Sequence, residues 1–164
     1  MNITSTRNKK GFSLIELMIV IAIIAILTGI ITANFTQSKS RARDAKRVSD
    51  MAQLQLSLAL FFDRCNGYPV VNGITVNQLT TDLEHVSCPD GINFGTYISV
   101  IPHPPVGGDA TFYKYVSNGT DYILSVDLED NSSALEDDID GTATMGAAEV
   151  QCDDVAFNYC VKPN

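Results

Sequence analysis

Residues 12–33 read FSLIELMIVIAIIAILTGIITA, a run of 22 residues with one ionisable side chain, Glu16. As a helix rising about 1.5 Å per residue, this run would extend roughly 33 Å, enough to cross a bilayer core of about 30 Å. A buried helix of a soluble protein is disfavoured, because no other part of the chain is large enough to surround it. The stretch therefore predicts a membrane-spanning helix.

A secretory signal peptide is the main alternative for a basic N-terminus followed by an apolar run. This run is longer than the apolar region of such a peptide, and no A-x-A-like cleavage site follows it. An ionisable group inside a membrane segment is costly and is a functional hypothesis by default. Glu16 is therefore a candidate functional residue, unless it lies at the membrane interface and stays hydrated.

Charge is segregated along the chain, which has 164 residues and a net charge of −8. Residues 1–11 carry three bases and no acid, and residues 39–64 carry six bases and three acids. Residues 65–164 carry two bases and fifteen acids. The length suggests one compact domain with an appendage. The chain is accordingly divided into a basic leader, an apolar segment, a basic stalk and an acidic head.

The stalk has helical spacing, because its apolar residues recur mostly at steps of three and four. These residues are Ala45, Val48, Met51, Ala52, Leu54, Leu58, Phe61 and Phe62. Asn66-Gly67-Tyr68-Pro69 supplies a C-terminal glycine and a proline stop. We expect one helix from Phe12 to about Arg64, roughly 80 Å long.

The basic cluster Lys39–Arg47 is not expected to bind nucleic acid. It lacks interleaved aromatic residues for base stacking, and the whole chain is acidic. A solvated helix face is the favoured interpretation of this cluster. Pairing with the acidic head of another subunit is a second hypothesis.

The head carries its clearest β signal at residues 111–117 and 121–128, which are rich in aromatic and branched side chains. Asn118-Gly119 between them predicts a hairpin. The alternating residues Tyr122, Leu124, Val126 and Leu128 should pack on the stalk, leaving the other sheet face in water. Residues 76–86 suggest a short helix, and the prolines and glycines of residues 101–108 exclude a regular element.

Residues 9–18, KKGFSLIELM, resemble the N-terminal signal of type IV prepilins and type II secretion pseudopilins. The resemblance covers roughly residues 7–35 and extends through the stalk to about Val70, with a looser match in the head. It implies an α+β pilin fold, with a long N-terminal helix (membrane segment plus stalk) packed on a small antiparallel β-sheet head. The implied regions are a prepilin leader (1–11), a transmembrane or filament-core helix (12–34), an amphipathic stalk helix (35–67) and a globular head (68–164).

The resemblance also implies a processing pathway. A prepilin peptidase would cut between Gly11 and Phe12 and N-methylate Phe12. The new amine of Phe12 would then pair with Glu16 of a neighbouring subunit, because much of the cost of burying each charge is recovered on pairing. Many type IVa pilins have a proline near the end of the membrane segment, where this chain has Ala33.

The implied location is the inner membrane, crossed once with a cytoplasmic leader and an extracytoplasmic head, followed by a pilus or pseudopilus. The basic leader agrees with a cytoplasmic N-terminus. The implied partners are other copies of the chain, the prepilin peptidase, an inner-membrane assembly platform and, before assembly, membrane lipid.

Residues 127–140 hold seven acids, which suggests either a solvated acidic surface or a calcium site. An EF-hand does not fit, because Ala147 stands where its twelfth residue must be glutamate. Major pseudopilins that this chain resembles often bind calcium in a C-terminal loop. The candidate ligands are Asp127, Glu129, Asp130, Asp137, Asp138 and Asp140, and no other cofactor is expected.

Four cysteines suggest two disulfides and an oxidising exterior. Of three possible connectivities, Cys65–Cys88 and Cys152–Cys160 are favoured because each closes a short loop. Free thiols are the alternative, and zinc is disfavoured because no C-x-x-C occurs.

The only histidines, His85 and His103, belong to no recognisable catalytic constellation, so an enzyme is not expected. The favoured function is a structural subunit of a type IV pilus-like or type II secretion pseudopilus filament. The alternative is a signal-anchored membrane protein whose acidic head binds calcium or another ligand.

Overall fold

The computed structural model describes residues 11–70, 77–89, 91–106, 112–145 and 148–163, and for residues 30–34 and 77 it describes the backbone alone. The described chain forms two compact units, which divide between Ser38 and Lys39. Its elements are helix α1 (Leu14–Cys65), strands β1 (Asn77–Gln78), β2 (Lys114–Ser117), β3 (Tyr122–Asp127), β4 (Gly141–Met145), β5 (Ala148–Cys152) and β6 (Asn158–Val161), and the 3-10 helices η1 (Phe94–Thr96), η2 (Ser133–Glu136) and η3 (Asp154–Ala156).

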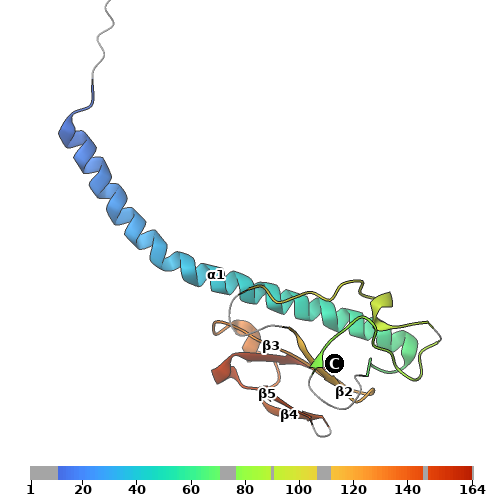
Figure 1. Ribbon diagram of the computed structural model, residues 1–164. Helices are drawn as coiled ribbons and strands as arrows, with labels where there is room; N and C mark the ends of the chain where they lie inside the picture. Colours follow the sequence, from blue (N-terminus) through green and yellow to red (C-terminus); the bar gives the residue numbers. More distant parts are fainter. Residues whose placement is uncertain (1–10, 71–76, 90, 107–111, 146–147, 164) are drawn as a thin grey trace, which may run out of the picture. The chain divides into compact units, whose positions relative to one another are not determined.

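Helix α1 begins in the first unit and ends in the second, close to the bounds expected from the sequence (Figure 1). In its first turn the side chain of Glu16 accepts a hydrogen bond from the Ser13 backbone N–H at 2.8 Å, which is one of the two hydrogen bonds of a capping box. Its end is set by Asn66, whose φ of 50° is left-handed and stops the helix. Within the described residues, no helix has the combined length and apolar character that crossing a membrane requires.

The main sheet has the strand order β1-β2-β3-β6, and each neighbouring pair is antiparallel. The predicted hairpin is present, because β2 and β3 pair from Ser117 opposite Tyr122 to Lys114 opposite Ser125. The Asn118 side chain caps the turn by accepting hydrogen bonds from the backbone N–H groups of Thr120 and Asp121. This turn fixes the register, and with it the face that each β3 side chain occupies.

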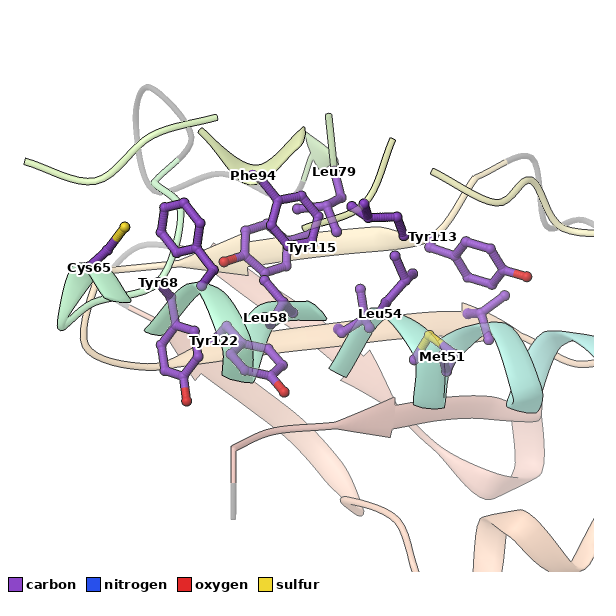
Figure 2. Packing of buried hydrophobic residues seen from close by; sticks show 14 of the residues in the cluster. Met51, Leu54, Leu58, Cys65, Tyr68, Leu79, Phe94, Tyr113, Tyr115 and Tyr122 are labelled. Atoms are coloured by element: carbon purple, nitrogen blue, oxygen red, sulfur yellow. The ribbon is translucent and has the colours of Figure 1, made fainter. Parts of the chain in front are cut away.

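The core lies between the second half of α1 and the main sheet (Figure 2). Met51, Leu54 and Leu58 of α1 are fully buried in one cluster with Tyr122 and Leu124 of β3. Burying a side chain of this size contributes about 1.5–3 kcal/mol relative to leaving it exposed. The predicted packing of this face of β3 on the stalk is confirmed, and so is the α+β pilin architecture.

The second face of the main sheet is not in water, and the prediction that it would be wet is wrong. Val116 and Ile123 are buried there against Val150 and Cys152 of β5, within a second apolar cluster. Strands β4 and β5 pair as a separate two-stranded sheet. The buried positions of β5 alternate with exposed ones, so this short sheet contributes a single apolar face that covers β3.

The predicted short helix at residues 76–86 is also wrong for the described part of that segment. Residues 77–78 form β1, and the rest of the segment to Val86 is turn and irregular backbone. Leu79 is fully buried and Leu83 packs against the same core. Single apolar residues of this segment therefore pack into the core from irregular backbone, and they do not form one face of a helix.

Candidate functional site

The described N-terminal end of the chain places Gly11, Phe12 and Glu16 in exposed positions. Phe12 is 94% exposed, and every large apolar side chain from Leu14 to Leu27 is at least 51% exposed. An apolar surface of this extent marks a site that contacts another protein or a membrane. Phe12 is still joined to Gly11 by a peptide bond, so only cleavage of that bond would create an amine close to Glu16.

The interpretation of the cluster Lys39–Arg47 as a solvated helix face is wrong for Arg43 and Arg47, whereas the other three bases, Lys39, Arg41 and Lys46, are exposed. Arg47 is fully buried, and its Nη1 lies 2.5 Å from an Asp44 oxygen and 2.7 Å from Oε1 of Glu129. Arg43 donates to the same Glu129 carboxylate with both Nε and Nη2. Arg43 and Arg47 therefore pair with Glu129 in the acidic head of the same chain, across more than eighty positions of sequence.

Asp44 completes this ion-pair network by holding the head backbone. Its carboxylate accepts hydrogen bonds from the N–H groups of Glu129 (3.0 Å) and Asp130 (2.9 Å). The pKa of Glu129 is lowered to about 2, chiefly by its hydrogen bonds with Arg43 and also by Arg47. A carboxylate that pairs with arginine is held in its charged form. The network thus holds residues 129–130 against residues 43–47 of the stalk.

Asp50 makes a second polar contact between helix and head. It accepts a hydrogen bond from the Tyr113 hydroxyl at 2.8 Å and pairs with Lys46 one turn earlier. Burial, and then the hydrogen bond to Asp50, raise the pKa of Tyr113. The hydroxyl therefore stays protonated and remains a donor to the carboxylate.

The structure divides the six candidate calcium ligands instead of gathering them. Asp127 pairs with Lys114 at 2.9 Å, Glu129 binds the two arginines, and Asp130 accepts from Ser40. Asp137 is exposed and lies outside the described cluster of acids. None of these four residues belongs to the cluster of carboxylates found among the described residues.

Asp138 and Asp140 do converge, together with Asp154, which sequence reasoning missed. One carboxylate oxygen of each residue lies within 4.8 Å of the others. Asp138 accepts from the Cys160 N–H at 2.7 Å, and its Oδ1 is buried with no hydrogen-bond partner among the described residues. Burial first, and then Asp154 and Asp140, raise the pKa of Asp138. Three such oxygens could hold a hard cation such as calcium.

The position of Asp154 follows from a disulfide. The structure joins Cys152 to Cys160, and Asp154 lies in the loop between them. The other disulfide joins Cys65, at the end of α1, to Cys88. This is the pairing favoured from the sequence. The short loop closed by Cys152 and Cys160 was the one signal for Asp154, because it keeps that residue close to β5 and β6.

Comparison with known proteins brings these features together. Residues 6–32 match the family model of the prokaryotic N-terminal methylation motif. The chain is 32% identical to the type II secretion system core protein G of Aeromonas hydrophila, over 81% of this chain and 92% of that protein. It is 30% identical to the Escherichia coli core protein G, over 82% of this chain and 92% of that protein. This chain belongs to the type II secretion system core protein G family.

The core protein G family is a family of pseudopilins, and this member is a structural filament subunit. Its N-terminal part is also similar to the major component of the type IV wide pilus of Thermus thermophilus, with 58% identity over 38 residues. That match covers 23% of this chain and 29% of the pilus protein. No solved structure matches the chain.

Proposed function

We propose that the chain is a subunit of a type II secretion pseudopilus, made as a precursor and cut between Gly11 and Phe12. The observation that carries this is the exposed apolar helix with Glu16 in its first turn, directly after the Gly11–Phe12 bond and inside the matched methylation motif. The core protein G relatives match over most of the chain, whereas the pilus relative matches its N-terminal part. This difference favours a pseudopilus over a pilus.

In this proposal residues 12–34 cross the inner membrane once, before assembly. The leader (residues 1–11) is cytoplasmic, in keeping with its three bases, and the stalk (35–67) and head (68–164) are extracytoplasmic. Prepilin peptidase removes the leader and N-methylates Phe12. The partners are membrane lipid, the assembly platform and then other copies of the chain, whose apolar helices replace lipid around residues 12–34.

Mass spectrometry of the protein from cells with prepilin peptidase tests this directly. We expect a mature chain that begins with N-methylated Phe12 and is recovered in sheared filaments. Gly11→Val should block cleavage and leave the full-length chain in the membrane, whereas Gly29→Ala should be processed normally. An intact leader on a detergent-soluble monomer in the wild type would favour the alternative, a signal-anchored protein with a ligand-binding head.

We also propose a calcium site at Asp138, Asp140 and Asp154. Three carboxylates would supply part of the six to eight oxygen ligands that calcium takes. The unpaired oxygen of Asp138 and the mutual repulsion of these groups support a cation at this position. No other cofactor enters the proposal.

A thermal-shift measurement on the full chain in detergent tests the calcium site. Calcium should raise the melting temperature of the wild type relative to chelator, and Asp154→Asn should remove most of that increase. Asp137→Asn, an exposed carboxylate outside the cluster, is the matched control and should respond like the wild type. An unchanged wild-type melting temperature would leave the cluster as a solvated acidic surface.

A further inference from the structure

The loop that follows β3 carries an acceptor sequence for covalent modification. Residues 131–133 read Asn-Ser-Ser, which fits the Asn-x-Ser/Thr pattern of N-linked glycosylation. Asn131 and Ser133 are both exposed. Ser132 between them has an extended backbone, with φ −113° and ψ 146°, so the side chains of its two neighbours point to the same side of the chain. The acceptor amide and the hydroxyl are therefore presented together on the surface.

A second sequence of this kind, Asn118-Gly119-Thr120, lies in the β2–β3 turn and offers a comparison within the same chain. There the Asn118 amide oxygen accepts hydrogen bonds from the Thr120 N–H (2.9 Å), the Thr120 hydroxyl (2.9 Å) and the Asp121 N–H (2.8 Å). The turn itself thus occupies both the amide and the hydroxyl that an enzyme would have to engage. Modification of Asn118 would require this turn to open, so Asn131 is the acceptor that the fold favours.

A polar hollow of about 320 Å³ lies beside Asn131. It is lined from α1 by Arg41, Asp44 and Ala45, and from the loop by residues 130–133. Sugar hydroxyls both donate and accept hydrogen bonds, and the hollow offers a guanidinium as donor and carboxylates as acceptors. The methyl group of Ala45 provides apolar surface for one face of a sugar ring. The hollow therefore suits the first sugar of a glycan attached to the loop.

We propose that Asn131 carries an N-linked glycan whose first sugar lies in this hollow. The co-substrate is a lipid-linked saccharide diphosphate, met on the extracytoplasmic side of the membrane. Nδ2 of Asn131 forms a bond to the anomeric carbon, the bond from that carbon to the phosphate oxygen breaks, and the lipid diphosphate leaves. One amide proton passes to a base of the transferring enzyme. The inference rests on the proposed function, because only an extracytoplasmic head meets this donor.

Mass spectrometry of the chain purified from the cells that make it naturally tests the modification. Cleavage before aspartate separates the two acceptor sequences, because it gives peptide 109–120 with Asn118 and peptide 130–136 with Asn131. We expect the mass of one or more sugars on peptide 130–136 and none on peptide 109–120. A peptide 130–136 that is wholly unmodified overturns the proposal.

Four variants of the full chain identify the linkage. Asn131→Gln and Ser133→Ala should each lose the added mass, because the first removes the acceptor amide and the second removes the hydroxyl that the pattern requires. Ser132→Ala and Thr120→Ala are the matched controls and should keep it. Both Asn131 and Ser133 are exposed, so their variants should keep the wild-type melting temperature. An added mass that remains in Asn131→Gln is attached to another residue and overturns the proposal.

The side of the membrane on which the head lies separates this inference from the proposed function. A mature chain recovered in filaments with an unmodified Asn131 overturns the inference alone. Protease added outside spheroplasts should degrade the head of the membrane-bound chain. A head that is fully protected lies in the cytoplasm, and that result overturns the proposed function together with the inference.

Discussion

Glu129 shows how single residues attach the head to the stalk. Its carboxylate lies against Arg43 and the fully buried Arg47, and its own N–H donates to Asp44. A buried charge is tolerated when it is paired and hydrogen-bonded, and the loss of one partner leaves the other exposed to the full desolvation cost. The three charged side chains around Glu129 therefore depend on it.

This arrangement predicts a pH dependence with a definite sign. Glu129 is ionised in the folded chain down to a pKa of about 2, whereas in the unfolded chain it takes up a proton near its ordinary value of 4.5. Its contribution to the free energy of unfolding is complete at neutral pH and is lost as the pH falls from about 4.5 to about 2. Glu129→Gln should lower the free energy of unfolding by about 2 kcal/mol at pH 7.

Urea unfolding of wild type and Glu129→Gln at a series of pH values measures this effect. The difference between the two proteins should shrink steadily below about pH 4.5, because the unfolded wild-type chain then takes up a proton at Glu129 that the folded chain does not. Asp137→Asn is the matched control for removing one exposed acid and should follow the wild type. A difference that stays constant from pH 7 to pH 3 would contradict the ion-pair role of Glu129.

Part of the ion-pair network could be predicted from the sequence, namely which charged residues of α1 face the core. Asp44, Arg47 and Asp50 follow each other at steps of three and share the buried face with Met51 and Leu54, so helical phase alone could have placed these charges inside. The residue of the head that pairs with these helix charges could not be predicted from the sequence. Glu129 is more than eighty residues away, and nothing in local spacing links it to Arg43 or Arg47. Conversely, Ala45 and Ala52 were expected in the buried stripe and are exposed.

At the scale of elements, strong local patterns were predictable and weak ones were not. Helix α1 and the β2–β3 hairpin have long periodic runs or a diagnostic turn, and both were expected close to their observed bounds. Strands β4, β5 and β6 are four or five residues long and contain mostly small and polar side chains. Their pairing depends on tertiary contacts with β3 and on the Cys152–Cys160 disulfide, which a local window does not contain.

The two disulfides act on different elements, and their removal should have different costs. Cys65–Cys88 connects residues 23 positions apart, whereas Cys152–Cys160 connects residues 8 positions apart. In the chain-entropy account a longer loop restricts the unfolded chain more, so replacing Cys65 and Cys88 by serine should cost about 3 kcal/mol and replacing the other pair slightly less. Urea unfolding of the two double variants measures this order.

Amide hydrogen exchange should show which part of the head the Cys152–Cys160 disulfide stabilises. Cys152 lies in β5 and Cys160 in β6, so this bond joins the two sheets. Its loss should speed amide hydrogen exchange in β4 and β5 before the main sheet opens. Equal exchange in the serine variant and the wild type would contradict the view that the bond holds β4 and β5 against β3.

For the whole molecule, the two compact units differ in how far they bury their apolar side chains. Residues 39–164 bury a core of their own, whereas the large apolar side chains from Leu14 to Leu27 remain exposed in the single chain. A single chain leaves the apolar side chains of its N-terminal unit uncovered. Exposed apolar surface of that extent marks a site that lipid or other subunits cover. Residues 12–38 carry one charged side chain, Glu16, whereas residues 39–164 carry eight bases and eighteen acids, a net charge of −10.

Glu16 offers a test of the proposed filament role, because its observed hydrogen bond and its proposed charge pair can be removed separately. In the uncut chain its carboxylate caps α1 by accepting from the Ser13 N–H at 2.8 Å. In the proposed filament its charge pairs with the freed Phe12 amine of a neighbouring subunit. Glu16→Gln keeps an oxygen that can accept the capping hydrogen bond but removes the charge, whereas Glu16→Val removes both.

We expect both Glu16 variants to insert into the membrane and to be cleaved after Gly11, yet to be absent from sheared filaments. An ammonium buried without a counter-ion costs several kcal/mol, so loss of the charge alone should lower incorporation by at least about a hundredfold. Immunoblots of membrane and filament fractions measure this. If Glu16→Gln assembles like the wild type while Glu16→Val does not, helix capping is the role of Glu16, and the charge pair with Phe12 is not required for assembly.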